Sequence, residues 1–546
     1  MKRILASALA LTMAFSATAM TSCSSEPAPE LISFNEKLAT AQELIDRINN
    51  MGEATLENEA LIEEIFIDYS RIDDSEKAKV TNYDKLDEAR NAITKLYHTE
   101  EKDGPRFDRS KIQIGTYCLY NTSEERIKWL NEAGIDFVAG APYNHDVLDL
   151  FSKYEIGAFI SYLPGWYGGD GSNAGGFASA VPSGAYDSYA ANFVDHPAIW
   201  AVDVGDEPNA AEFPHYGIMI EEAKALFPNQ LVYLNLYPNY ANKDQEGTDN
   251  YEGYIQVYTD NVNTDYISFD FYNIVMRDRQ NKDSRTGKLK GSDHYLFRHL
   301  ENLRIVANAC RETGRDMWTV IQANALSDIP LDYLSVDQLN VQVYTSLAFG
   351  SQVINWACWE NGWYDYDTNM ITGSGERTPV YYRVAEVNKN IKALSPVYMR
   401  YENTDAALLG SLDFIKYTES NMGNDKINFV KNDGNVLEQD MFQNIEIISD
   451  EAKIVTGSFV KRSGEGDAIL FANTTDFFAK DAITRVEIVS ATEISFTLKD
   501  ADRKVVIYYP ELAYVMEPDE NGVYRFSLEN TDGVFITAEP VAETAE

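Results

Sequence analysis

Residues 199–209 read IWAVDVGDEPN, an apolar run that ends in two adjacent carboxylates and a turn. The apolar part predicts a buried strand, and Pro208 with Asn209 turns the chain away from its end. A carboxyl group at the mouth of a buried strand is partly desolvated and can carry a raised pKa, which suits acid–base chemistry. Glu207 is therefore the first candidate for a functional residue. The alternative is an acid that only caps the turn after an ordinary strand.

Similar apolar runs recur from Lys111 to Pro396, where they alternate with helical patterns. Because the runs lack a clean polar alternation, they predict a parallel sheet that is covered on both faces. The eight predicted strands are Ile112–Tyr120, Phe137–Tyr143, Gly157–Leu163, Ile199–Asp206, Leu231–Tyr237, Tyr266–Tyr272, Met317–Gln322 and Val353–Trp359. The predicted helices are Ser123–Ala133, His145–Tyr154, Ile218–Phe227, Tyr295–Thr313, Val336–Phe349 and Arg377–Leu394.

Eight strand–helix units predict an α/β fold, a (β/α)8 TIM barrel, for which ~250 residues is typical. We expect this barrel domain to span residues 105–400. A doubly wound open sheet is the competing arrangement. It has no reason to stop at eight strands, and no Gly-rich phosphate loop follows the first strand.

The carboxyl ends of the predicted strands, where barrels carry their chemistry, collect aromatic, amide and carboxylate side chains. Flat aromatic rings stack on the apolar faces of sugars, whereas amides and carboxylates bind hydroxyl groups. The candidate substrate-binding residues are Tyr117, Tyr143, Trp166, Asp206, Asn235, Tyr237, Tyr272, Gln322, Trp356, Trp359 and Trp363. The alternative for any one of the aromatic residues is that it roofs the barrel.

With these residues the chain resembles clan A glycoside hydrolases, the broad β-galactosidase and cellulase superfamily. In that group the general acid/base is a Glu after the fourth strand, commonly in an Asn-Glu-Pro context, and Asp206-Glu207-Pro208 stands at the matching place. The segment Ser346–Glu360 is similar to the Trp-rich end of β-galactosidase-like barrels. The resemblance implies an oligo- or polysaccharide substrate, a glycosidic oxygen protonated by Glu207, and no cofactor.

The chain departs from that superfamily on the seventh strand, where a Glu nucleophile would stand. Gln322 ends this strand, and a neutral amide is a poor nucleophile. The second catalytic carboxylate would then be Asp270 after the sixth strand, Glu360 after the eighth, or Asp206 beside Glu207. A pair on the fourth and sixth strands has precedent in other sugar-cleaving barrels, which favours Asp270.

Two further functions compete with hydrolysis by paired carboxylates. The first is a glycan-binding lipoprotein on a barrel that has lost catalysis, which the missing seventh-strand Glu supports. The second is a metal-dependent barrel hydrolase. The six His residues offer no pair of ligands on one face, so we predict no metal site.

Residues 1–22 predict a secretory signal, with a short basic start, an apolar run and small residues before Cys23. The run resembles a bacterial lipobox, which implies lipidation of Cys23, a tether over residues 23–30, and an exported protein anchored at the cell surface or periplasmic face. The alternative is an ordinary signal peptide that is cleaved nearby. No other apolar run is long enough to cross a bilayer.

Residues 31–100 are charged and helical in pattern, and they resemble the three-helix spacer repeats of bacterial surface proteins. We interpret this segment as a stalk, with a helical cap on the barrel as the alternative. Beyond residue 400 the helical period gives way to short β-rich runs, including Ala468–Ala472, Thr484–Val489 and Glu493–Leu498. These runs predict an all-β sandwich over residues 401–546. We interpret it as a brace for the barrel, with carbohydrate binding as the alternative.

The formal net charge of -40, from 86 acidic and 46 basic residues, argues against nucleic acid and anionic membrane surfaces as partners. Cys118, Cys310 and Cys358 remain after processing, and their spacing fits neither a disulfide framework nor a metal site. Cys118 and Cys358 lie on the first and last predicted strands, which are neighbours in a closed barrel. A disulfide could join them, but two buried thiols are favoured.

Overall fold

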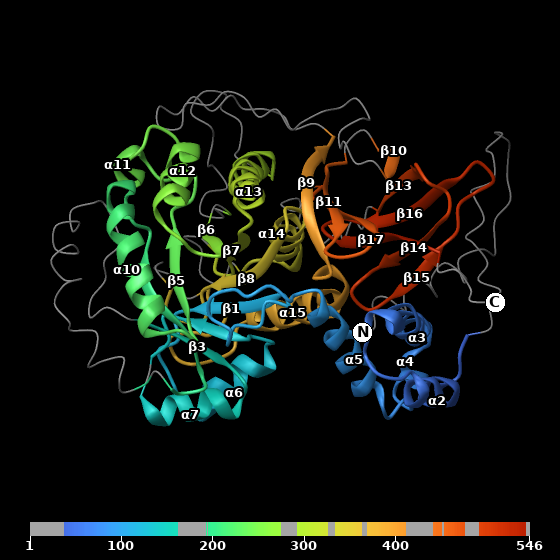
Figure 1. The fold of residues 1–546 in the computed structure, drawn as a ribbon, viewed down its shortest axis with the longest axis horizontal. Helices are drawn as coiled ribbons and strands as arrows, with labels where there is room; N and C mark the ends of the chain where they lie inside the picture. The colour runs from blue at the N-terminus through green and yellow to red at the C-terminus, as the bar shows by residue number, and fades with distance from the viewer. Residues whose placement is uncertain are drawn as a thin grey trace, which may run out of the picture. The chain divides into compact units, whose positions relative to one another are not determined.

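The structure is a computed structural model, and it describes residues 38–142, 144–161, 193, 195–272, 274, 292–325, 333–362, 368–410, 441–449, 452–475 and 491–541. The chain divides into two compact units, Met1–Ala39 and Thr40–Glu546, and Figure 1 labels the elements of the second. No helix in these ranges combines the length and the apolar character that crossing a membrane requires.

Eight parallel strands form a closed barrel, in which each strand pairs with the next and β8 pairs with β1 (Figure 1). The strands are β1 (Gln113–Tyr117), β2 (Phe137–Ala139), β3 (Gly157–Ser161), β4 (Ile199–Asp206), β5 (Leu231–Leu236), β6 (Tyr266–Phe271), β7 (Asp316–Gln322) and β8 (Ser351–Ala357). Every one overlaps its predicted range. The prediction of a TIM barrel is confirmed.

Helices follow most of the barrel strands. They are α6 (Glu124–Glu132), α7 (His145–Lys153), α10 (Phe213–Leu226), α11 (Lys243–Glu246), α12 (Tyr251–Asn261), α13 (Ser292–Thr313), α14 (Val336–Ala348) and α15 (Pro379–Tyr398), with a 3-10 turn η3 (Ala210–Glu212). Helix α12 is not among the predicted helices, because its Gly and many β-branched or aromatic residues have low helix propensity. Its buried residues Tyr251, Tyr254, Ile255 and Tyr258 nevertheless follow the helical spacing, so packing forms this helix.

Large side chains fill one end of the barrel. Phe107, from the segment that precedes β1, lies with its ring centroid 4.8 Å from that of Trp318, and Trp318 stacks on Tyr266 at 4.1 Å. Phe137 and Phe159 belong to the same apolar cluster. Because these rings stand near the amino ends of the strands, the polar inward-facing side chains are left at the carboxyl ends.

The C-terminal region is a β-sandwich of two antiparallel sheets with the strand orders β15-β14-β17-β12-β11-β9 and β10-β13-β16. Both sheets contribute to one apolar core, in which the rings of Phe471 and Phe526 lie 5.3 Å apart. The strands are β9 (Tyr401–Leu409), β10 (Phe442–Ile447), β11 (Ile454–Lys461), β12 (Asp467–Asn473), β13 (Ala491–Leu498), β14 (Arg503–Tyr508), β15 (Ala513–Met516), β16 (Val523–Glu529) and β17 (Gly533–Pro540). The β domain is as predicted, although the predicted strand Thr484–Val489 lies outside the described residues.

The N-terminal helices pack against the barrel and the sandwich. They are α2 (Ala41–Asn50), α3 (Glu59–Arg71), α4 (Asp74–Lys77) and α5 (Tyr83–Leu96), with a 3-10 turn η1 (Leu56–Asn58). Ser70 of α3 donates a hydrogen bond to the Ala513 carbonyl at 3.0 Å, and Thr94 of α5 donates to the Pro396 carbonyl at 2.5 Å. The segment is therefore held on two neighbours, which corrects the stalk interpretation in favour of a helical cap.

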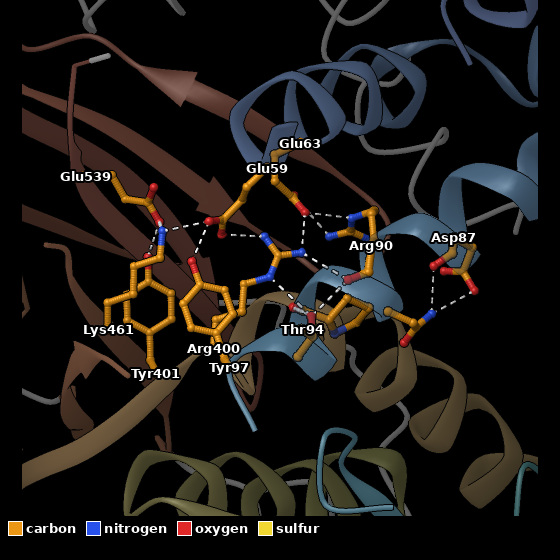
Figure 2. Close-up of polar contacts among 12 residues, drawn as sticks. Glu59, Glu63, Asp87, Arg90, Thr94, Tyr97, Arg400, Tyr401, Lys461 and Glu539 are labelled. Atoms are coloured by element: carbon orange, nitrogen blue, oxygen red, sulfur yellow. Dashed lines mark hydrogen bonds and ion pairs between the residues drawn. The ribbon is translucent and has the colours of Figure 1, made fainter. Parts of the chain in front are cut away.

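A buried cluster of charges joins these three parts of the chain (Figure 2). Arg400, which follows α15, pairs with Glu59 at 3.0 Å and with Glu63 at 2.7 Å, both on α3. Arg90 of α5 pairs with Glu63 at 3.0 Å, and Lys461 of β11 pairs with Glu59 at 3.2 Å. Burial by itself would raise the pKa of Glu63, but the two arginines outweigh it and lower this pKa to about 2.

We expect Arg400→Ala to lower the free energy of unfolding by about 3 kcal/mol, because Glu59 and Glu63 would each stay buried with one cation, Lys461 and Arg90 respectively, in place of two. Urea denaturation at pH 7 measures the loss. A matched control is Arg525→Ala, since Arg525 pairs with Asp519 at the exposed surface and should cost under about 1 kcal/mol. Equal losses in the two variants would contradict the assigned role of the cluster.

The same comparison carries a pH dependence. The folded-state pKa of Glu63 lies below its usual 4.5. Its stabilising contribution is therefore complete above pH 4.5 and is lost as the pH falls toward about 2. The deficit of Arg400→Ala should accordingly shrink over that interval.

Candidate active site

Three carboxyl groups and one amide meet at the carboxyl ends of β4, β5 and β6. The Nδ2 atom of Asn235 donates hydrogen bonds to Asp206 Oδ1 and to Asp270 Oδ1, each at 3.1 Å. The carboxyl group of Glu207 shares a hydrogen bond with that of Asp270. Asp206, Glu207, Asn235 and Asp270 are called the carboxyl cluster from here on. All four are residues that the sequence singles out, and the fold brings them together.

The irregular end of β4 delivers two consecutive carboxyl groups to this cluster. The register of β4 against β5 pairs Asp203 with Tyr233 and Asp206 with Asn235, so β4 holds one extra residue between the two pairs. This bulge turns Asp203 and Asp206 to the same face of the sheet. Glu207 then leaves the strand with φ 49°, in the left-handed region that residues other than Gly seldom adopt.

The bulge and the turn overcome a constraint on consecutive residues, which point to opposite faces of a regular strand. The backbone N–H of Glu207 donates to the Asn235 carbonyl at 3.0 Å and holds the turn in place. Unfavourable backbone geometry of this kind persists where the surrounding structure enforces it, and it is concentrated at functional sites.

A chain of hydrogen bonds from the barrel interior orients the Asn235 amide. Ser268 Oγ donates to Asn235 Oδ1 at 2.9 Å, the Tyr233 hydroxyl lies 3.0 Å from Ser268 Oγ, and the Tyr117 hydroxyl lies 2.6 Å from that of Tyr233. Because Oδ1 already accepts from Ser268, both N–H groups of Asn235 face carboxylates. Tyr117, a predicted substrate ligand, has its hydroxyl engaged in this chain.

Sequence reasoning misses Ser268, Tyr233 and Asp203, although a signal for the first two exists. Ser268 stands two residues before Asp270 on β6, and Tyr233 stands two residues before Asn235 on β5. Since side chains on a strand alternate between faces, residues two apart share the inward face. A search one step deeper along each strand would have found them.

Burial raises the pKa values of the carboxyl groups in the cluster. Burial first, and then the charge of Asp206, raises the pKa of Glu207 to about 8. Burial raises the pKa of Asp206 to about 6 against the hydrogen bond from Asn235. Asp270 is 2% exposed, and burial together with the charges of Glu207 and Asp206 raises its pKa well above the usual value. The cluster therefore retains protons at neutral pH.

Asp203 extends this acidic environment one layer deeper into the barrel. Burial and the charge of Asp206 raise its pKa to about 8, while the Gly205 N–H, donating to Asp203 Oδ1 at 3.2 Å, opposes the shift. A protonated Asp203 adds no negative charge beside Asp206. This arrangement helps Asp206 to ionise near neutral pH.

Gln322 is not available to a substrate. Its Oε1 accepts the Ile274 N–H at 3.0 Å, and its Nε2 donates to the Ile274 carbonyl at 2.9 Å and to the Asn324 carbonyl at 2.8 Å. The side chain is fully buried. The amide therefore fastens the chain after β6 to the end of β7, which corrects its expected role as a ligand of sugar hydroxyls.

Glu360 anchors a loop. It is 4% exposed, and its Oε1 accepts the N–H groups of Tyr120 at 2.6 Å and Asn121 at 2.7 Å. These bonds join the chain after β8 to the chain after β1 and do not involve the carboxyl cluster. Of the two residues expected to partner Glu207 from other strands, Asp270 is the one that lies in the carboxyl cluster.

Trp356 and Trp359 are packing residues. Both are fully buried. Trp356 Nε1 donates to Asn388 of α15 at 2.8 Å, and the Trp359 ring lies 5.8 Å from that of Tyr381 on the same helix. Their side chains thus contact the helical layer, which corrects the expectation that they bind sugar rings.

The remaining predicted aromatic residues divide into two groups. Tyr237 and Tyr272 lie close enough to the cluster for its charges to act on them. Burial raises the pKa of both hydroxyls, and a smaller further rise comes from the charge of Glu207 on Tyr237 and of Asp270 on Tyr272. Tyr143, Trp166 and Trp363 lie outside the described residues.

No family model matches the sequence, and no curated protein is similar to it. Among solved structures, a glycoside hydrolase family 5 protein from Bacteroides vulgatus is 10% identical over 78% of this chain and 89% of that chain, with a TM-score of 0.43. A family 30 xylanase from Clostridium acetobutylicum is 10% identical over 79% and 96%, with a TM-score of 0.39. A β-galactosidase from Marinomonas ef1 is 9% identical over 52% and 60%, with a TM-score of 0.36. Likeness at this level transfers no chemistry, so the function rests on the carboxyl cluster.

We expect Gln322→Glu to destabilise the fold by about 1–3 kcal/mol, because a carboxylate would face two carbonyl oxygens that now accept N–H bonds. Thermal unfolding followed by circular dichroism measures the change. Gln42→Glu, on the exposed face of α2, is the control; it exchanges a surface hydrogen bond to Asp46 for a repulsion between two acids and should cost about 0.5 kcal/mol or less. A Gln322→Glu protein as stable as the wild type would show that the amide is free of these backbone contacts.

Proposed function

We propose that the protein is a glycoside hydrolase that cleaves O-glycosidic bonds in oligo- or polysaccharides with Glu207 as general acid. The observation that carries the proposal is the carboxyl cluster, in which Asn235 bridges Asp206 and Asp270 while Glu207 shares a hydrogen bond with Asp270. It lies at the carboxyl ends of barrel strands, where barrel enzymes hold catalytic groups. Glycoside hydrolysis requires this chemistry, a protonated carboxyl group beside an ionised one.

In the proposed reaction Glu207 donates its proton to the glycosidic oxygen while the bond breaks toward an oxocarbenium-like state. A pKa of about 8 keeps Glu207 protonated at neutral pH. The hydrogen bond between the two groups lowers the pKa of Glu207 and raises that of Asp270. In the proposal the shared proton therefore moves to Glu207 when the substrate binds, which leaves Asp270 ionised as the second carboxylate. Asn235 stabilises that charge through its N–H group.

A bound sugar has to replace the hydrogen bond between Glu207 and Asp270. Two carboxyl groups in direct contact are closer than the ~5 Å separation of a retaining pair. The described arrangement is thus a resting state, in which the pair stores the proton that the leaving group needs.

Asp206 is the second candidate for the partner role. With a pKa of about 6 it is mostly ionised at neutral pH, and the second N–H group of Asn235 holds it in place. Separate Asp206→Asn and Asp270→Asn variants distinguish the two carboxylates. Only the loss of the carboxylate that reacts with the sugar should change how the sugar intermediate is converted to product.

The competing function is glycan binding without cleavage. The lack of a carboxylate at Gln322 favours it. A binding site, however, has no use for several carboxyl groups with raised pKa values, since burying them costs desolvation and binding alone transfers no proton.

Glu207→Gln should lower turnover by about 10²–10⁴ on unactivated glycosides, the usual worth of a general acid. The loss should be much smaller on dinitrophenyl glycosides, whose leaving group departs without a proton. Steady-state kinetics on a panel of aryl glycosides and natural polysaccharides measures both. Asp249→Asn, at a side chain that is 94% exposed, is the matched control. Turnover within twofold of wild type in Glu207→Gln would remove Glu207 from the mechanism.

The pH profile of kcat/KM should fall as the pH rises through about 8, because the acid form of Glu207 is complete below its pKa of about 8 and is lost above it. On the acid side the profile should fall near pH 6 as Asp206 takes up a proton. Asn235→Ala removes the N–H bond that lowers the pKa of Asp206, so its acid limb should move to higher pH. An unchanged acid limb in that variant would show that the ionisation of Asp206 does not determine the pH profile.

We also propose that the enzyme is an exported lipoprotein anchored through Cys23, which rests on the sequence because Cys23 lies outside the described residues. Cys23→Ser should release the protein from the membrane fraction or leave it unprocessed. Fractionation with immunoblotting measures this outcome. A mutant that is mature in size and still sediments with membranes would contradict the anchor.

A further inference from the structure

Cys118 and Cys358 face each other across the seam where β8 closes the barrel onto β1. The last paired residues of these strands are Thr116 and Trp356, and each cysteine follows two residues later. Beyond them the backbone bonds shift by one residue, since Trp359 N–H donates to the Tyr117 carbonyl at 2.9 Å and Glu360 N–H donates to the Cys118 carbonyl at 3.3 Å. Neighbouring strands lie about 5 Å apart, and both cysteines belong to one apolar cluster with Val320. Their side chains therefore lie close together; a disulfide requires a Cα–Cα distance of about 4.4–6.8 Å.

The two thiols are in contact but not bonded. Both are free cysteines, and their side chains share a hydrogen bond. A disulfide between them would therefore join two side chains that already lie side by side. Cys310, the third described cysteine, is buried elsewhere and its Sγ donates to the Asp316 carbonyl at 3.5 Å.

The pair is asymmetric in exposure. Cys358 has no exposed surface and packs beside Val320, whereas Cys118 is partly exposed. The hydrogen bond with Cys358, and then that with Tyr120, lower the pKa of Cys118, while burial and the charges of Asp206 and Glu360 oppose the shift. Burial instead raises the pKa of Cys358. Such a combination suits an accessible attacking thiol with a buried resolving thiol behind it.

We propose that Cys118 and Cys358 form a redox modification site, at which an oxidant of the disulfide class converts the two thiols into a disulfide bond. The Cys118 thiolate attacks one sulfur of the oxidant and releases the first oxidant thiol. The Cys358 sulfur then displaces the second oxidant sulfur from Cys118, and its proton goes to the departing thiolate. The pair loses two electrons and two protons, and the oxidant's disulfide is reduced to two thiols.

The bond would lock the barrel at its seam. It would link residues far apart in the chain, so it would restrict the unfolded state and raise the resistance of the fold to heat. Cys118 also lies near enough to Asp206 for their charges to interact. The cysteine pair thus lies beside the carboxyl cluster. The proposal does not depend on which reaction that cluster performs.

The test is oxidation of the purified full chain with oxidised glutathione, followed by alkylation, peptide mapping and thermal unfolding. We expect a cross-linked peptide that contains Cys118 and Cys358, the loss of two free thiols, and a rise in Tm of about 3–8 °C that dithiothreitol reverses. Cys310→Ser should show the same response. Cys118→Ser and Cys358→Ser should show no cross-link and no rise in Tm.

Two results would overturn the proposal. One is a wild-type chain that keeps all of its thiols, or that only accumulates glutathione adducts, under oxidant that fully converts a reference dithiol. The other is a cross-link that includes Cys310. The peptide map of the wild type decides between these outcomes even if a serine variant fails to fold.

Discussion

The closed ring of parallel strand pairing, completed by β8 and β1, is the constraint on which the site depends. It gives every strand an inward face and aligns all eight carboxyl ends at one mouth. The amino ends are filled by the rings around Phe107 and Trp318, which leaves the opposite end to polar groups. The strand register then aligns the polar residues, since it pairs Asp206 of β4 with Asn235 of β5, and Asn235 with Ser268 of β6.

The protein solves the burial of acidic side chains in two opposite ways. Around Arg400 the charges are paired, so Glu63 stays ionised and its pKa falls to about 2. In the carboxyl cluster the described partners are an amide and other carboxyl groups, so the pKa of Glu207 rises to about 8. The paired charges connect the cap, α15 and the sandwich, whereas carboxyl groups without a cationic partner in the cluster retain their protons. The contrast separates a structural cluster from a candidate reactive one on physical grounds.

A few charged side chains connect the cap, the barrel and the sandwich. Arg400 stands at the junction of α15 and β9, where the barrel ends and the sandwich begins, and its partners lie more than three hundred residues earlier in the chain. Lys461 adds a contact from β11 to Glu59. Removing the helical segment would take away both carboxylates that pair with Arg400 and would leave Lys461 with Glu539 alone, so the segment belongs to the stability of the whole unit.

The sequence by itself determined the strands, most helices, the β domain and the central candidates Glu207, Asp206, Asn235 and Asp270, because apolar runs and the polar residues that end them are local features. Only the tertiary structure decided which way side chains at the strand ends point. Gln322 binds backbone, and Trp356 and Trp359 pack on α15, because neighbouring segments reach them first. The bulge in β4 likewise turns Asp203 and Asp206 to one face, and no local pattern records it. Side-chain direction and the pairing of distant charges arise from packing between elements, which composition and periodicity within one element do not contain.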